Sequence, residues 1–357
     1  MRMVIKTALR FCLAFPLVVN AAQGDKALMV EQKLLTGMQA MQNLALNQAV
    51  GAFSEISQEN PNYKLVQLMQ ADLLALKAGK QEMLAEYRKS HPKTISKLED
   101  EARVRWQFAE NALQKNSGFE HYVLKSAQQK YMVIVNIPDS RLYLFGADKN
   151  GKMQQLADYY VTVGSKGAGK QKEGDKRTPI GVYHVVDMIE DQRLPELYGV
   201  GALPINYPNK WDKSLGKTGS GIWLHGVPRD TYIRAPRSSR GCVVLNNSAM
   251  EKLLTEYSLP LSTPIIIVDE ESSQLTFNRD SVYLVDEVRA WLNDNQPGLA
   301  WKDVSIFRYP SEENLYYVTF PAGKDKMVHQ FWKRDLEGEW RIAVQDTEAK
   351  EIKYVFR

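Results

Sequence analysis

The sequence predicts an α+β protein of two or three domains, with a helical N-terminal domain, a mostly-β central domain and a small C-terminal α+β domain. Two observations lead to this prediction. A chain of 357 residues, 44% of them hydrophobic, can bury more than one core. The spacing of its apolar residues is helical over the first third, alternates from about Lys130, and becomes helical again after about residue 280.

Residues 1–22 have the features of a secretory signal peptide. Basic residues precede an apolar run, Phe11–Val19, and small residues at Ala21 and Ala22 suit cleavage. The run is too short for a membrane-spanning helix. We therefore expect an exported, periplasmic protein without stable membrane insertion. Removal of the segment lowers the formal charge from +4 to about +1, which favours neither nucleic acid nor a membrane surface as a partner.

Residues 23–117 are expected to form an antiparallel helical domain. Pro61 and Gly79 interrupt its pattern, as breaks between helices do. Apolar residues recur at helical spacing, for example at Leu65, Leu68, Met69, Leu73 and Leu76. Such a domain serves as a structural module or as a docking site for a protein partner.

Residues 118–270 are expected to form the mostly-β central domain. A turn at Pro138-Asp139-Ser140 joins the first two strands into a hairpin, and a short helix is expected over Ser248–Tyr257. The expected strands cover residues 131–137, 141–145, 159–164, 181–187, 221–225 and 264–268.

Residues 271–357 are expected to form the C-terminal α+β domain. A helix over Val282–Asn293 precedes the strands, and the segment Gly338–Ile342 resembles a late strand of the NTF2-like fold. A plain β-sheet cap is the alternative. The expected strands cover residues 304–309, 315–320, 328–333 and 340–344.

The glycine-rich segment Gly164–Lys170 has the glycine and lysine spacing of a phosphate-binding loop. Gln171, however, stands where such loops carry the magnesium-binding Ser or Thr. Residues 172–179 contain Gly174 and Pro179, which disfavour the helix whose N-terminus would hold a phosphate. The sequence therefore predicts a loop near a substrate and no nucleotide site.

Cys242 is the one cysteine outside the signal segment, and it follows His225 by seventeen residues. A thiol needs a nearby imidazole or cation to become a good nucleophile, which His225 and Arg240 could supply. The backbone amides of Gly241 and Cys242 could stabilise an oxyanion. The alternative is a small buried cysteine and a structural histidine, each common in protein cores.

Three segments together resemble the L,D-transpeptidase (YkuD-like) catalytic domain. These are His225-Gly226, then Ser239-Arg240-Gly241-Cys242, and upstream Thr178-Pro179-Ile180-Gly181-Val182-Tyr183. The resemblance covers roughly residues 130–270. It implies a mostly-β fold that acts on peptidoglycan stem peptides, with Cys242 as nucleophile and His225 as base.

Two positions depart from the commonest pattern of that family. Arg240 replaces a histidine before Gly-Cys, and Val244 replaces a polar residue after it. The Ser-Arg-Gly-Cys form resembles a subgroup of L,D-carboxypeptidases that control cell shape and carry a C-terminal NTF2-like domain. The resemblance thus leaves open a transpeptidase, an L,D-carboxypeptidase that trims tetrapeptide stems with water, or a wall-associated scaffold with an inactive site.

Basic residues cluster around the expected site, and stem peptides carry free carboxylates that arginine binds well. A solvated charged surface is the alternative for most of them. We expect the substrate to be bordered by Arg240, Ser239, Arg237, Gly226 and Tyr207.

No metal or other cofactor is predicted. The five histidines are scattered, without the paired spacing of metal ligands, and a cysteine acyl-enzyme needs no cofactor. A papain-like peptidase would place its cysteine before its histidine, and a sortase would separate histidine and cysteine by many more residues.

Overall fold

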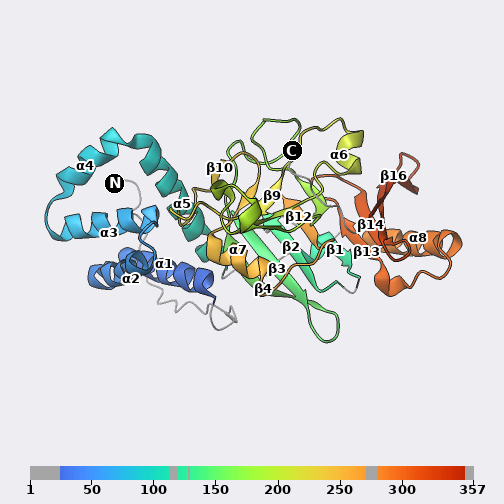
Figure 1. Ribbon diagram of the computed structural model, residues 1–357, viewed down its shortest axis with the longest axis horizontal. Coiled ribbons are helices and arrows are strands. Elements are labelled where there is room, and N and C mark those ends of the chain that lie inside the picture. Colours follow the sequence, from blue (N-terminus) through green and yellow to red (C-terminus); the bar gives the residue numbers. More distant parts are fainter. Residues whose placement is uncertain (1–24, 113–118, 128, 271–279, 350–357) are drawn as a thin grey trace.

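The computed structural model describes residues 25–112, 119–127, 129–270 and 280–349. They form three regions in a row along the longest axis of the molecule (Figure 1). The helical region lies at one end, the β-rich central domain in the middle, and an antiparallel sheet with one long helix at the other end. The predicted fold class is confirmed. The predicted signal peptide lies outside the described residues.

The N-terminal region is a set of consecutive helices, of which the first three and the fifth contribute side chains to one apolar core. They are α1 (Lys26–Gln42), α2 (Leu46–Glu59), α3 (Lys64–Lys77), α4 (Gln81–Ser90) and α5 (Pro92–Ala112). Asp25 caps α1 by accepting the amide N–H groups of Ala27 and Leu28. A Cβ at Gly37 would lie 2.5 Å from the Phe53 ring, so α1 and α2 approach closely because Gly37 has no side chain.

The central domain contains two main sheets that pack on a common core with α7 (Asn247–Leu254). The larger sheet has the order β4-β3-β2-β12-β6 and the smaller one β11-β9-β8-β7. The larger sheet is made of β2 (Tyr131–Asn136), β3 (Arg141–Ala147), β4 (Met153–Tyr160), β6 (Gly181–His184) and β12 (Pro264–Val268). The smaller sheet is made of β7 (Ile189–Glu190), β8 (Gly201–Pro204), β9 (Trp223–His225) and β11 (Val243–Val244).

Several short elements of this domain were not predicted. Besides β7, β8 and β11, they include β10 (Arg237–Ser239), which pairs with β5 (Val163–Gly164), and the helix α6 (Lys210–Ser214). The strand expected over residues 159–164 is divided, since β4 ends at Tyr160 and β5 starts at Val163. Strands of two to four residues contain too few alternations to be recognised in a sequence. Short 3-10 helices lie at Phe119–Tyr122, Asp191–Arg193, Glu196–Tyr198 and Trp301–Asp303.

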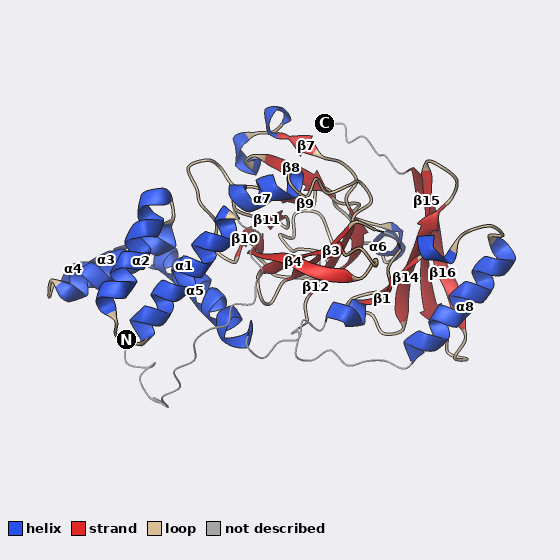
Figure 2. Cartoon of the chain, turned by 90° about the horizontal axis from the view of Figure 1, so that it is seen from below, coloured by secondary structure: helices blue, strands red, loops and turns tan. Residues whose placement is uncertain are grey.

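The C-terminal region is a five-stranded antiparallel sheet of order β1-β13-β14-β15-β16, with α8 (Asp280–Asn295) on the face away from the central domain (Figure 2). Its last four strands are β13 (Ser305–Arg308), β14 (Leu315–Pro321), β15 (Lys326–Arg334) and β16 (Trp340–Ala349). The edge strand β1 (Val123–Lys125) pairs with β13 although it precedes the central domain in the chain. A boundary at residue 118 therefore assigns to the central domain a strand that belongs to this sheet.

Alternation along β14 divides its side chains between two cores. Tyr316 and Val318 pack with α8, whereas Tyr317 faces the central domain. On that inner face, Trp211 of α6 stacks on Phe331 with ring centroids 5.9 Å apart. Among the described residues, no helix combines the length and the apolar character that crossing a bilayer requires.

Candidate active site

Cys242 and His225 are brought together by two neighbouring strands. β9 and β11 pair in parallel, with Val243 opposite Leu224 and Val244 opposite His225, and Cys242 directly precedes β11. The Tyr198 ring lies 4.9 Å from the rings of both Trp223 and His225. Cys242 packs in the same small cluster as Trp223 and Tyr198. Parallel pairing thus brings two segments that are seventeen residues apart in the sequence onto neighbouring strands.

The hydrogen bond of His225 determines which of its nitrogens is free. Nδ1 of this buried ring lies 2.6 Å from the carbonyl oxygen of Gly226. A carbonyl only accepts, so Nδ1 carries the proton and Nε2 has a free lone pair. Burial lowers the pKa of His225 to about 4, an effect that the Gly226 hydrogen bond opposes and the charge of Arg234 reinforces. His225 is therefore a neutral imidazole at neutral pH, which is the form that can accept a proton.

The thiol of Cys242 is partly exposed and donates to the carbonyl oxygen of Gly221 at 3.4 Å. Burial raises its pKa, while a backbone hydrogen bond from Trp223 and the charges of Arg234 and Lys170 act in the opposite direction. With a neutral histidine beside it, the resting site holds a thiol and an imidazole. A thiol in this state becomes a good nucleophile only when a neighbouring base takes up its proton.

Among cations, Arg234 and not the predicted Arg240 lowers the pKa of this thiol most. Arg234 is half-buried, and its carbonyl oxygen accepts hydrogen bonds from Thr162 at 2.8 Å and Tyr160 at 3.2 Å. Arg240 is exposed. Arg234 belongs to the basic cluster seen in the sequence, but its distance from Cys242 along the chain gave no reason to select it.

The loop before Cys242 is held by the Ser239 side chain. Its hydroxyl accepts the amide N–H of Gly241 at 3.0 Å and donates to the carbonyl oxygen of Cys242 at 2.7 Å. The Gly241 amide is thus engaged by Ser239 in this structure. That the amides of Gly241 and Cys242 stabilise an oxyanion stays a prediction. Ser239 is buried and shapes the loop, and its contact with substrate stays a prediction.

Two glycines of the site occupy positions that exclude a side chain. Gly241 has a φ of +128°, and a Cβ there would lie 2.7 Å from the carbonyl oxygen of Arg177. A Cβ at Gly226 would lie 2.2 Å from Oδ1 of Asn247. Asn247 Oδ1 accepts the amide N–H of Val227 at 3.0 Å. Gly226 therefore positions His225 through its carbonyl, with Asn247 as a support that sequence reasoning missed.

Thr178, in the Thr-Pro segment, connects two loops of the site. Its buried hydroxyl accepts the amide N–H of Gly164 at 2.9 Å and donates to the carbonyl oxygen of Gly241 at 2.9 Å. The segment Gly164–Lys170 folds against it as a loop, and no helix follows within residues 171–180. The sequence-based rejection of a phosphate-binding loop therefore agrees with the local backbone.

The remaining predicted substrate residues differ in exposure. Arg237 is exposed at the start of β10. Tyr207 is buried, donates to the carbonyl oxygen of Thr218 at 3.3 Å, and has the Lys170 ammonium 5.9 Å from its ring centre. Lys170 also pairs with Asp175 at 2.9 Å. Tyr207 and Lys170 are therefore buried side chains held by contacts within the domain, whereas the side chains of Arg237 and Arg240 are exposed.

Ligands that could hold a metal meet elsewhere in the molecule. In the described part of the chain, one group of at least three such side chains converges, and it consists of His184, His329 and Glu348. The sequence-based expectation of scattered histidines missed it, because three different strands supply its members.

Residues 130–267 match the L,D-transpeptidase catalytic domain. The matched segment contains His225, Ser239, Gly241 and Cys242. A 107-residue part of the chain is 31% identical to the putative L,D-transpeptidase YafK of Escherichia coli K12, which corresponds to 29% of this chain and 39% of that relative. The match thus spans about two fifths of the relative's length.

The three-dimensional structure also resembles solved structures. A point mutant of the helical cell shape determining protein Pgp2 from Campylobacter jejuni aligns over 69% of this chain and 99% of its own, at 20% identity and a TM-score of 0.50. Bd1075 of Bdellovibrio bacteriovorus aligns over 64% of this chain and 98% of its own, at 22% identity and a TM-score of 0.44. At 20% identity, the likeness to Pgp2 concerns the fold alone.

Proposed function

We propose that this protein is an exported peptidoglycan-modifying enzyme of the L,D-transpeptidase type, which transfers acyl groups through a thioester on Cys242. The observation that carries the proposal is the tautomer of His225. Its Nδ1 is bound to the Gly226 carbonyl, so Nε2 is free to act as a base. The parallel pairing of β9 with β11, in which Val244 lies opposite His225 and Cys242 directly precedes β11, supports the proposal.

The reaction uses His225 first as a base and then as an acid. Nε2 takes the thiol proton as the Cys242 sulfur attacks the carbonyl carbon at the L-centre of the diamino acid in a tetrapeptide stem. The Cys242 amide stabilises the oxyanion. When the tetrahedral intermediate collapses, the C–N bond breaks, His225 returns the proton to departing D-alanine, and a thioester remains.

The acceptor decides the product. Water gives a tripeptide stem and makes the enzyme an L,D-carboxypeptidase, whereas the amine of a second stem gives a cross-link. Both acceptors lose a proton to His225 Nε2 as they attack, and both regenerate the thiol. We propose that Arg237 and Arg240, whose side chains are exposed, bind stem carboxylates in either case.

Incubation of the purified protein with disaccharide tetrapeptides tests the proposal directly, with products separated by liquid chromatography and identified by mass spectrometry. We expect tripeptide or cross-linked dimer, and a rate lower by about 10⁴-fold or more for Cys242→Ala. Ser238→Ala is the matched control, because its hydroxyl donates only to the nearby Ala235 carbonyl, and should react within a few fold of the parent. Absence of any Cys242-dependent product would overturn the proposal and favour a scaffold.

The pH profile tests the role of the neutral imidazole. Because the pKa of His225 is lowered to about 4, kcat/KM should stay level from neutral pH down to about pH 5 and fall only near pH 4. The charge of Arg234 contributes to this lowering, so Arg234→Gln should move the acid limb to higher pH. Arg240→Gln should leave the limb in place. An acid limb near pH 6.5 in the parent would contradict a buried neutral base.

A further inference from the structure

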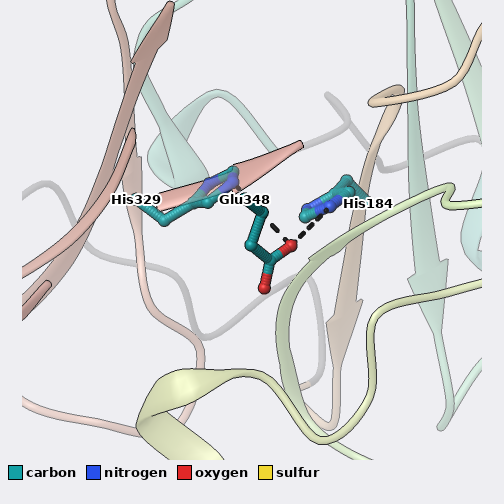
Figure 3. Close-up of side chains that lie close together, drawn as sticks. All are labelled: His184, His329 and Glu348. Carbon is teal, nitrogen blue, oxygen red and sulfur yellow. Dashed lines mark ion pairs between the residues drawn. The ribbon is translucent and has the colours of Figure 1, made fainter. Parts of the chain in front are cut away.

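Three ionisable side chains from different strands converge between the central domain and the C-terminal sheet. His184 ends β6, His329 lies in β15, and Glu348 lies in β16. Figure 3 shows the Glu348 carboxylate extending towards both rings. Oε2 of Glu348 lies 3.4 Å from Nε2 of His184 and 4.0 Å from Nε2 of His329. One potential ligand atom from each residue lies within 4.8 Å of the other two.

Both histidines of the cluster are buried and Glu348 is half-buried, and several polar atoms of the three side chains have no hydrogen-bond partner. His329 is 6% exposed and His184 is 8% exposed. Among the described residues, His329 Nε2, Glu348 Oε2 and His184 Nδ1 are buried atoms without a hydrogen bond. Buried polar groups are nearly always satisfied, and each exception requires an explanation. An ion shared by these atoms would satisfy the first two at once.

The orientation of His329 is set by hydroxyl groups on the opposite side of its ring. Its Nδ1 is hydrogen-bonded to Tyr317 and lies 3.2 Å from the Thr319 hydroxyl. Hydroxyl oxygens can accept an Nδ1–H, which leaves the Nε2 lone pair directed at Glu348. Metal-binding histidines characteristically use their second ring nitrogen in such a supporting hydrogen bond.

We propose that His184, His329 and Glu348 bind a divalent transition-metal ion, of which Zn²⁺ is the representative, and that this ion joins the C-terminal sheet to the central domain. Two imidazoles and one carboxylate form a ligand set that such ions favour. The site is separate from Cys242 and needs none of the chemistry proposed there.

The distances are close to those of a bound ion. With the usual zinc–ligand bond lengths, two ligand atoms of a tetrahedral site lie roughly 3.4 Å apart. The contact between His184 and Glu348 has this separation already, whereas that between His329 and Glu348 is longer, at 4.0 Å. The two rings lie within 10° of parallel. Binding therefore requires one ring to turn until both lone pairs point at the same ion.

Zinc binding is to be measured on the full chain, purified without a histidine tag, stripped with a chelator and titrated with Zn²⁺ against a chromophoric competitor. Cys242→Ala serves as the parent, because a thiol beside His225 could bind Zn²⁺ itself. Glu348→Gln and His329→Gln remove ligands in that parent. His91→Gln is the control, since it removes an exposed histidine from the helical region.

We expect the parent and the His91→Gln control to bind one Zn²⁺ per chain and to gain thermal stability from it. Removal of a ligand should weaken binding by more than the roughly 10- to 100-fold that loss of an outer hydrogen-bond partner costs. Circular dichroism shows whether each ligand variant folds. If one of the two does not, the Zn²⁺ affinity of the other tests the proposal. Absence of stoichiometric binding by the parent, or equal binding by the ligand variants, would overturn the proposal.

Discussion

The interface between the helical region and the central domain contains a network of buried charges, whereas the interface between the central domain and the C-terminal sheet is built mainly from aromatic rings. In the helical interface, Glu31 of α1 contacts both Arg105 of α5 and Arg141 of β3, and Arg141 also pairs with Asp158 at 3.4 Å. Arg141 is 1% exposed. Burial alone would raise the pKa of Glu31, but Arg105 and Arg141 together lower it.

In the C-terminal interface, Trp211 stacks on Phe331, and Tyr309 packs edge-on against the same ring at 5.9 Å. Its ionisable cluster of His184, His329 and Glu348 is poorly satisfied by the chain alone. The contrast teaches that burial of charge has two outcomes here. In the helical interface, opposite charges of the chain neutralise one another. In the C-terminal interface, the His184, His329 and Glu348 side chains keep buried polar atoms that have no hydrogen-bond partner.

The largest effect is expected from Glu31→Gln, which leaves two buried guanidinium groups without the carboxylate they share. Breaking a buried ion pair on one side costs about 3–5 kcal/mol, so the free energy of unfolding should fall by this amount. Urea unfolding of the full chain measures it. Glu55→Gln is the matched control, because its partner Lys33 lies at the surface, and should cost less than about 1 kcal/mol. Equal costs would mean that the buried charges of the helical interface stabilise the protein no more than a surface ion pair does.

The pH dependence of the free energy of unfolding should distinguish the core of the central domain from the helical interface. His225 has a folded-state pKa of about 4 against an ordinary value of 6.5, so the unfolded chain binds the proton first as the pH falls. Its contribution is complete above pH 6.5 and is lost as the pH falls towards 4, by about 3 kcal/mol. Chemical unfolding across this range should show that slope in the parent and in Glu31→Gln. His225→Gln should reduce this slope without abolishing it, because burial also lowers the pKa of His329, to about 3. A slope in His225→Gln equal to that of the parent would assign the effect to other groups.

An intermediate effect is expected from Trp211→Phe at the C-terminal interface. The smaller ring leaves part of the contact with Phe331 unfilled, at a cost of about 1–2 kcal/mol. Leu336 is fully exposed, so Leu336→Ala should change the free energy of unfolding by no more than about 0.5 kcal/mol. If Trp211→Phe matched this control in thermal or urea unfolding, ring packing would not be what holds the C-terminal interface.

The smallest effect is expected from Glu348→Gln in metal-free buffer. Its carboxylate is partly solvent-accessible and its Oε2 lacks a hydrogen bond, so its loss should cost less than about 1 kcal/mol. Unfolding in the presence of a chelator measures this value beside that of Glu31→Gln. A cost as large as that of Glu31→Gln would mean that the C-terminal cluster, like the helical interface, is stabilised by its own charges.

Local patterns were enough to predict much of the fold. The hairpin around Pro138–Ser140 and the helix at Val282–Asn293 were predicted because alternation, turn residues and helical spacing are read within a dozen neighbouring residues. The two-residue strands β7 and β11 were not, since pairing partners and not their own sequence define them. The membership of β1 in the C-terminal sheet depends on contacts across the whole central domain.

The order and spacing of His225, Gly241 and Cys242, together with the apolar periodicity, determined the fold class and the candidate nucleophile and base from sequence alone. Tertiary structure decided which cation acts on the thiol, that Ser239 engages the Gly241 amide, and that His184, His329 and Glu348 meet. The physical reason is the distance along the chain over which each interaction acts. Periodicity and turn chemistry act between neighbours in the chain, whereas burial, charge coupling and ligand geometry arise only when distant strands pack together.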